Sequence, residues 1–170
     1  VSGSLFDDVL SGNGAANVIL GDFGNDTLSG GDGADTLYGD GRIWVDTADS
    51  AGGSGPIALF GEADDGSGPA AGNDTLIGGS GNDTLTGGAG NDSFVFAPGF
   101  ANDLVQSFGD VNNNQDVIEV STAMFANFAA LQGAMVQSGA NVLITDATGD
   151  VLTVQGTTIA ALGSDDFRFF

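Results

Sequence analysis

The sequence of 170 residues contains neither cysteine nor histidine. The chain therefore cannot form disulfide bonds, thiolate nucleophiles, zinc sites built on nitrogen and sulfur ligands, or a Ser-His-Asp triad. Basic residues are almost as scarce, because only Arg42 and Arg168 oppose 23 acidic residues, for a formal net charge of −21. This charge repels phosphate groups, so we expect no nucleic-acid partner.

Long apolar runs are also missing. No segment approaches the roughly 20 apolar residues that a membrane-spanning helix needs, and the N-terminus has no signal-peptide pattern. The sequence starts at Val1 and its first repeat starts at Gly3, so we expect a fragment of a longer protein. Three prolines accompany 30 glycines, and glycine at that density means that the backbone repeatedly adopts conformations that other residues avoid.

Repetition with a period of nine residues organises the first half of the chain. Position one is glycine, position six is Asp or Asn, and position eight is Leu, Ile or Phe. The uninterrupted units are GSLFDDVLS from Gly3, GNGAANVIL from Gly12, GDFGNDTLS from Gly21, GGDGADTLY from Gly30, GGSGNDTLT from Gly78 and GGAGNDSFV from Gly87. A further unit opens at Gly39 and resumes at Ala71 if residues 41–70 form a loop extruded from one turn. The alternative is that residues 41–70 are a flexible linker.

Each unit predicts a turn followed by a short strand. Positions one to six are rich in glycine and form the turn, while positions seven to nine, such as Thr27 to Ser29, carry one inward apolar side chain. Two units then complete one coil of a flattened parallel helix. The inward residues at position eight are Leu10, Ile19, Leu28, Leu37, Leu76, Leu85 and Phe94.

The sixth-position residues are predicted to stack in two columns, because units two apart lie on the same side. One column holds Asp8, Asp26, Asp74 and Asp92, and the other holds Asn17, Asp35 and Asp83. Parallel strands lie about 4.8 Å apart, and two carboxylates at about 5 Å repel by about 3 kcal/mol at an effective dielectric of 20. A cation between coils turns this repulsion into attraction. Ca²⁺ is favoured over Mg²⁺ because carboxylates and turn carbonyls make a flexible oxygen shell.

We therefore expect several Ca²⁺ ions, and a chain that is largely disordered without them. The strongest sites are expected among the turns of Asp26, Asp35, Asp74, Asp83 and Asp92. The sequence argues against calcium between the first two turns, where Phe6 and Ala15 replace glycine and Asn17 replaces a carboxylate. The candidate ligands are Asp8, Asp22, Gly24, Asp26, Gly31, Gly33, Asp35, Asp40, Gly72, Asp74, Gly79, Gly81, Asp83, Gly88, Gly90, Asp92 and Asp103.

The repeats over residues 3–95 resemble the glycine-rich nonapeptide G-G-x-G-x-D-x-U-x of repeat-in-toxin (RTX, hemolysin-type) proteins. The resemblance implies a calcium-binding parallel β-roll. The expected fold is accordingly all-β, a parallel β-roll (a β-helix or solenoid) with a mixed β cap containing one short helix. Residues 1–95 form the predicted roll, and residues 96–170 form the predicted cap.

The expected cap begins with two decayed repeats, Asn102 to Val105 and Gln115 to Ile118. Apolar residues near helical spacing predict an amphipathic helix over 122–135, and alternating segments predict strands over 141–145 and 150–154 joined by a tight turn. From Ser93 onward, Phe-Val-Phe, Asp-Val-Ile-Glu-Val-Ser and a closing Asp-Phe-Arg-Phe resemble the C-terminal region of serralysin-type proteases and other type I secreted proteins. This resemblance implies an uncleaved secretion signal, type I secretion machinery as partner, and an extracellular location outside a Gram-negative bacterium.

The leading functional hypothesis is a calcium-dependent folding and secretion module without catalytic activity of its own. Its parent would be an extracellular protease, lipase or polysaccharide-modifying enzyme. One alternative is an extracellular polysaccharide-binding module, with Arg42, Trp44 and Phe60 of the insert as its contacts. Another is a structural fragment of a surface layer or adhesin.

Overall fold

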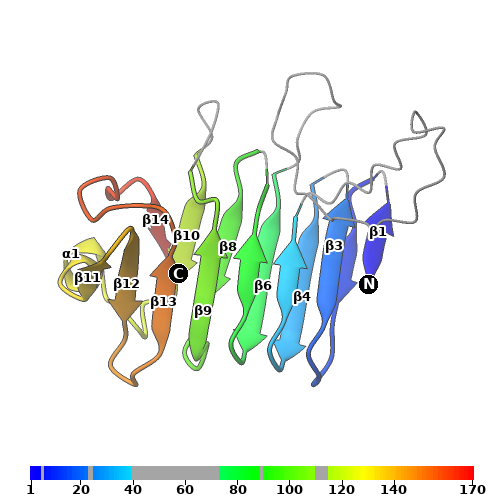
Figure 1. The fold of residues 1–170 in the computed structure, drawn as a ribbon, viewed down its shortest axis with the longest axis horizontal. Coiled ribbons are helices and arrows are strands. Elements are labelled where there is room, and N and C mark those ends of the chain that lie inside the picture. Colours follow the sequence, from blue (N-terminus) through cyan, green and yellow to red (C-terminus); the bar gives the residue numbers. More distant parts are fainter. Residues whose placement is uncertain (5, 23–24, 40–72, 89, 110–114) are drawn as a thin grey trace.

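The computed structural model describes residues 1–4, 6–22, 25–39, 73–88, 90–109 and 115–170. Within these residues, short strands form two stacked sheets that run side by side along the length of the molecule (Figure 1). The first sheet has the order β1 (Ser2–Ser4), β3 (Val18–Asp22), β5 (Thr36–Tyr38), β7 (Thr84–Thr86), β9 (Asn102–Gln106), β13 (Val151–Val154), β12 (Asn141–Thr145) and β11 (Met135–Ser138). The second sheet has the order β14 (Phe167–Phe169), β10 (Val117–Val120), β8 (Ser93–Phe96), β6 (Thr75–Ser80), β4 (Thr27–Asp32) and β2 (Val9–Ser11).

Consecutive strands alternate between the two sheets through β10, so each pair of units makes one coil, and the predicted parallel β-roll is confirmed. In-register pairing stacks the eighth-position residues on their equivalents one coil away, for example Leu28 on Leu76 and Leu37 on Leu85. Six of the seven predicted ladder residues are fully buried, and Leu10 at the N-terminal end is partly buried. Alternation of small polar and apolar residues thus places one side chain per strand in a thin core.

The parallel ladders continue past Val95. Strand β9 pairs with β7, and β10 pairs with β8, so the two decayed repeats supply further strands of the roll. The sheets then end differently. The first sheet continues through β13 into the antiparallel strands β12 and β11, while the second ends at β14.

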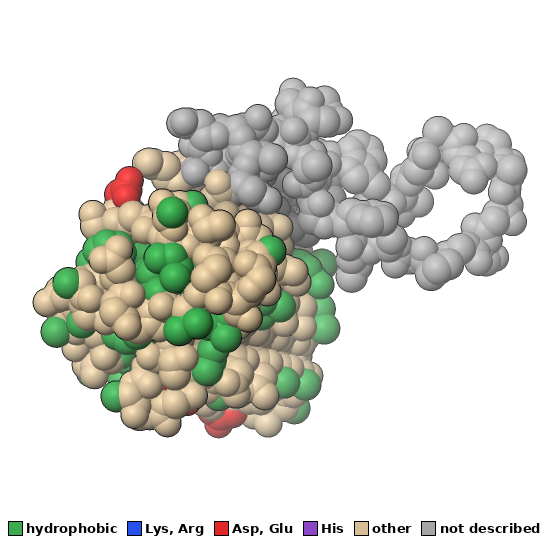
Figure 2. Space-filling view, turned by 60° about the vertical axis from the view of Figure 1, so that its left-hand side comes forward, with side chains coloured by type: hydrophobic (Ala, Val, Ile, Leu, Met, Phe, Trp, Pro, Cys, Tyr) green, Lys and Arg blue, Asp and Glu red, His purple; other side chains and the backbone are tan. Residues whose placement is uncertain are grey.

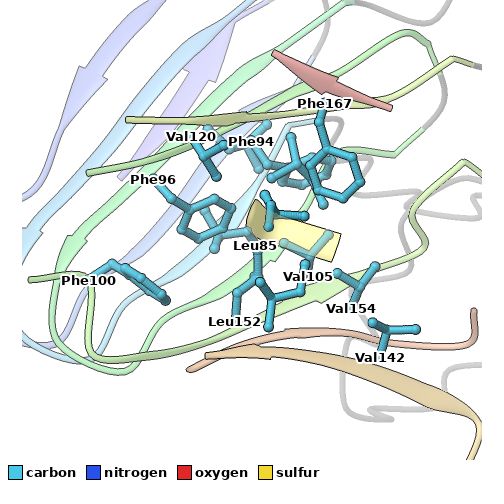
Figure 3. Packing of buried hydrophobic residues seen from close by; sticks show 14 of the residues in the cluster. Leu85, Phe94, Phe96, Phe100, Val105, Val120, Val142, Leu152, Val154 and Phe167 are labelled. Carbon is cyan, nitrogen blue, oxygen red and sulfur yellow. The ribbon is translucent and has the colours of Figure 1, made fainter. Parts of the chain in front are cut away.

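Aromatic residues widen the core at the C-terminal end. Phe96 packs edge-on against Phe100 with ring centroids 5.5 Å apart. Figure 3 shows these rings with Val105, Leu152 and Val154 of the first sheet facing residues of the second sheet. The sheets therefore end on a filled apolar core, as expected of a cap.

One short helix, α1 (Phe128–Gln132), lies in the described part of the cap. The prediction of a helix over 122–135 was wrong in extent. Residues 121–125 instead form a turn in which the Met124 and Phe125 N–H groups donate to the Ser121 carbonyl. Asn127 caps α1 by accepting the Ala130 N–H at 3.0 Å, and strand β11 begins at Met135.

The predicted strands of the cap are present. Strands β12 and β13 pair antiparallel through the turn at Asp146 to Asp150, as the sequence indicated. The predicted insert, residues 41–70, lies outside the described residues. The described residues contain no helix with the length and apolarity needed to cross a bilayer.

Candidate metal centre

The sixth-position residues form two columns, as predicted, one on each side of the flattened coil. The Asp26 column follows strands of the first sheet, and the Asp35 column follows strands of the second. Both columns extend one coil beyond the nonapeptides. The Asp26 column contains Asp8, Asp26, Asp74, Asp92 and Asp116, and the Asp35 column contains Asn17, Asp35, Asp83 and Asp103.

A repeated hydrogen bond builds each column. The backbone N–H of one sixth-position residue donates to Oδ1 of its counterpart in the next coil. Asp35 donates to Asp83 at 2.6 Å, and Asp83 donates to Asp103 at 2.8 Å. In the other column Asp26 donates to Asp74 at 2.7 Å and Asp74 donates to Asp92 at 2.8 Å. One carboxylate oxygen is thus used by the backbone of the roll.

The second oxygen, Oδ2, lies in the interior of the turn. In Asp35, Asp83 and Asp103 this atom is buried and accepts no hydrogen bond from any described residue. Glycine at position one explains how the side chain fits, because a Cβ on Gly30 or Gly78 would collide with Oδ2 of the aspartate five residues later. The invariant glycine therefore makes room for a carboxylate folded back over its own turn.

Glycines at positions two and four shape the rest of each turn. Gly79 and Gly81 have φ of 100° and 132°, a region that residues with a Cβ rarely adopt. A Cβ at either residue would also overlap a backbone carbonyl of the neighbouring turn. Positive φ also occurs at the other described glycines whose carbonyl oxygens are predicted calcium ligands, namely Gly31, Gly33, Gly88 and Gly90.

The electrostatics of the buried carboxylates call for a cation. Burial is the largest cause that raises the pKa of Asp83 above 3.8; the Asp35 N–H opposes this shift, and the Asp35 charge adds to it. Burial likewise raises the pKa of Asp103 to about 8, opposed by the Asp83 N–H and aided by the charges of Asp83 and Asp150. Each carboxyl therefore needs either a proton or a nearby positive charge in the folded roll.

The described residues supply almost no positive charge that could neutralise these carboxylates. Its one described basic side chain, Arg168, contacts Glu119 at 3.4 Å on the surface. Eight aspartates are buried, and acidic side chains are sparse on the face that Figure 2 presents. A divalent cation fits this deficit, and the oxygen-only donor set suits Ca²⁺.

Within the described residues no three acidic side chains gather to hold one ion. Each ion would therefore combine one or two sixth-position carboxylates with carbonyls of adjacent turns, such as those of Gly79 and Gly81. Bound there, Ca²⁺ supplies positive charge and structural cross-linking between coils.

In some turns, a backbone N–H of the same turn donates a hydrogen bond to the sixth-position side chain. The Ser4 N–H donates to Asp8 Oδ2 at 2.6 Å, and the Asn13 N–H donates to Asn17 Oδ1 at 2.7 Å. These contacts occupy the oxygens that an ion would need. They give a physical reason to expect weaker binding in the first two turns.

The remaining predicted ligands are placed only in part. Asp92 and its equivalents Asp26 and Asp74 are buried in their column. Asp22 is the last residue of strand β3, but its side chain is not among those that the structure describes. Gly24, Asp40 and Gly72 also lie outside the described residues. The assignment of individual ligands stays a prediction.

Sequence reasoning missed the role of position five. Asn73 Oδ1 accepts the Asn91 N–H at 2.7 Å, and Asn25 Oδ1 accepts the Asn73 N–H at 2.9 Å, so exposed asparagines form a second ladder beside the Asp26 column. Asn82 makes the equivalent bond to Asn102 beside the Asp35 column. The signal was present in the recurring Gly-Asn-Asp, which fixes asparagine next to the buried aspartate.

Comparison with known proteins agrees with this geometry. A family model described as "RTX calcium-binding nonapeptide repeat (4 copies)" matches residues 1–28, 11–41 and 70–100. No curated protein sequence matches the chain.

Solved structures with a similar fold include two subunits of a mannuronan C5-epimerase from Azotobacter vinelandii. The chain is 27% identical to the AlgE6R2 subunit with a TM-score of 0.51, covering 95% of this chain and 91% of that one. It is 27% identical to the AlgE6R3 subunit with a TM-score of 0.49, covering 98% and 80%.

A third similar structure is the extracellular lipase LipA from Serratia marcescens, at 15% identity and a TM-score of 0.44. The match covers 97% of this chain but only 38% of the lipase. The family match identifies residues 1–41 and 70–100 as RTX calcium-binding nonapeptide repeats, and the described residues among them form a β-roll with buried aspartate columns.

Proposed function

We propose that this chain is a calcium-dependent folding and secretion module of a larger type I secreted protein. The observation that carries the proposal is the burial of Asp35, Asp83 and Asp103 with an unpartnered carboxylate oxygen in each. As charged carboxylates, such groups oppose folding unless an ion neutralises them. Ion binding energy therefore becomes folding energy, and the calcium concentration controls whether the roll forms.

This dependence suits a protein that must cross an export channel unfolded. At the low calcium of a cytosol the carboxylates repel and the chain remains extended. At about millimolar calcium, the range of extracellular modules, the roll forms. Folding outside a Gram-negative cell then hinders backward movement through the channel.

The C-terminal segment is the proposed secretion signal. In the folded state its residues Phe167–Phe169 form β14, which pairs in parallel with β10. The Asp166 carbonyl accepts the Ile118 N–H at 2.8 Å, so the segment is tied into the second sheet. We infer that it is recognised before folding and incorporated into the cap afterwards. The module itself would have no catalytic activity.

The test combines folding and export. Far-UV circular dichroism of the full chain in strong chelator is expected to show disorder, with cooperative β-structure appearing near millimolar calcium. An otherwise identical chain with Asp26, Asp35, Asp74, Asp83 and Asp92 changed to Asn should lose this transition and be exported more slowly. A wild-type spectrum that is the same in chelator and in calcium would contradict the calcium-dependent folding. Unchanged export of the variant would contradict the secretion role.

A second candidate function is polysaccharide binding. The observation that favours it is the likeness to the AlgE6R2 subunit of a mannuronan C5-epimerase. With a net charge of −21, the chain would hold an anionic polysaccharide only through bridging calcium. Affinity electrophoresis in alginate gels with and without calcium separates the two functions, because a pure folding module migrates unretarded in both.

A further inference from the structure

The turn at residues 98–103 departs from the nonapeptide sequence but keeps its backbone. Gly99 and Ala101 have φ of 89° and 65°, which matches the positive φ of Gly79 and Gly81 at positions two and four. The family match ends at residue 100, within this turn. Alanine in a left-handed conformation costs about 1 kcal/mol or more. The turn therefore holds a strained backbone that leads into Asp103.

Asp103 is 2% exposed. Its Oδ1 accepts the Asp83 N–H at 2.8 Å. Its Oδ2 is buried and meets no hydrogen-bond donor among the described residues. The last carboxylate of the Asp35 column thus keeps one oxygen available on the interior side of the turn.

A second carboxylate reaches this turn from the cap. The Val151 N–H donates to the Ala101 carbonyl at 2.7 Å, which places Asp150 beside residues 98–103. The side chain of Asp150 is half-buried, and its Oδ2 is also enclosed without a hydrogen-bond donor in the described part of the chain. Its negative charge acts on Asp103. The two unsatisfied oxygens therefore belong to carboxylates whose charges interact, Asp103 in β9 and Asp150 directly before the paired strand β13.

The hairpin turn fixes Asp150 in place. Oδ1 of Asp146 accepts the N–H groups of Thr148, Gly149 and Asp150 at 2.8, 2.9 and 3.0 Å. The Asp146 N–H in turn donates to the Asp150 carbonyl at 3.0 Å. Asp146 is therefore a positioning residue, with its own charge satisfied by the turn.

We propose that Asp103 and Asp150 bind a Ca²⁺ ion that joins the last turn of the roll to the hairpin β12–β13 of the cap. The remaining ligands are backbone carbonyls and water, as calcium accepts in a flexible shell. This inference rests on the proposed function, since it requires calcium to reach the folded module. The competing arrangement is a single proton held between the two carboxylates, which needs no metal.

The test counts ions on the full chain. Equilibrium dialysis against calcium chloride, with bound metal measured by mass spectrometry, compares the wild type with Asp150→Asn. Asp165→Asn is the matched control, because it removes the same charge at an exposed position of the cap. We expect Asp150→Asn to bind about one ion fewer per chain and the control to bind as many as the wild type. An equal count for Asp150→Asn overturns the inference in favour of the shared proton.

A second measurement decides the matter if Asp150→Asn does not fold. Wild-type crystals soaked in terbium chloride are expected to show an anomalous peak between Asp103 and Asp150. Peaks in the other turns without one at this position overturn this inference alone. A wild-type chain that binds no calcium in dialysis instead refutes the proposed function.

Discussion

The substitution Asp83→Asn is expected to have opposite effects without and with calcium. Asp83 lies inside the Asp35 column, and its Oδ1 accepts the Asp35 N–H at 2.6 Å. Asparagine retains this acceptor and replaces the buried Oδ2 with an uncharged amide group. The substitution therefore removes a charge while it preserves the hydrogen bond that joins two coils.

The magnitude follows from the spacing of the coils. Carboxylates about 4.8 Å apart repel by about 3 kcal/mol at an effective dielectric of 20. Asp35 contributes this repulsion, whereas Asp103 contributes little at neutral pH because its pKa of about 8 leaves it mostly protonated. The metal-free fold of the variant should gain up to about 3 kcal/mol. In calcium the variant lacks one charged ligand, and the lost attraction exceeds the relieved repulsion because Ca²⁺ carries two charges and lies closer to the carboxylate than a neighbouring carboxylate does. Each 1.4 kcal/mol of this excess raises the calcium midpoint about tenfold.

Two titrations followed by far-UV circular dichroism test this reversal. Trimethylamine oxide added in chelator favours compact states without supplying ions, and the variant should fold at a lower concentration of it than the wild type. Calcium added without the osmolyte should fold the variant only at a higher concentration. Asp165→Asn, which removes an exposed charge, should change neither midpoint appreciably. The reasoning is refuted if the variant moves in the same direction in both titrations.

Two further perturbations follow from the same turns. Because the pKa of Asp103 is raised from 3.8 to about 8, protonation favours the metal-free fold: its contribution to stability is complete below about pH 4 and disappears as the pH rises through 8. Circular dichroism in chelator should therefore show β-structure increasing from pH 9 to 5, and a flat profile would contradict this. Gly81→Ala places a Cβ against the Gly33 carbonyl at a φ of 132°, so we expect a loss of about 1–3 kcal/mol or more, seen as a higher calcium midpoint. Gly14→Ala, where a Cβ meets open space, should have almost no effect, and an equal loss in both variants would exclude the steric explanation.

The sequence was sufficient to predict the roll because every unit repeats the same pattern of glycine, aspartate or asparagine, and one apolar residue. Leu28, Leu76 and their equivalents recur at position eight, so the in-register ladder follows from period alone. The same period places Asp35 against Asp83, and the hydrogen bond between them confirms that pairing. A fold in which neighbouring units are identical leaves few alternatives for strand register.

The period fails where turns change length. Asp83 bonds Asp103 at a separation of 20 residues, and Asp92 bonds Asp116 at 24, whereas nonapeptides place partners 18 apart. Strand pairing fixes the register of the sheet, but a turn can accommodate extra residues without disturbing it. Asp116 therefore belongs to a column that its spacing in the sequence does not indicate. Asp150 approaches through an antiparallel hairpin, a contact outside any repeat.

The residue at position two correlates with whether the sixth-position side chain accepts a hydrogen bond within its own turn. The correlation holds for the turn of Asp8 and for the nonapeptide turns of the Asp35 column. Ser4 and Asn13 do not adopt positive φ, and each directs its N–H to the side chain four residues later. Gly31 and Gly79 adopt positive φ, and the carboxylates of Asp35 and Asp83 keep an unsatisfied oxygen. In these fully described turns no glycine N–H donates to Oδ2 of the sixth-position side chain. Turns with glycine at position two thus keep a carboxylate oxygen that a cation would satisfy, so an uncharged residue marks the turns in which calcium would be needed.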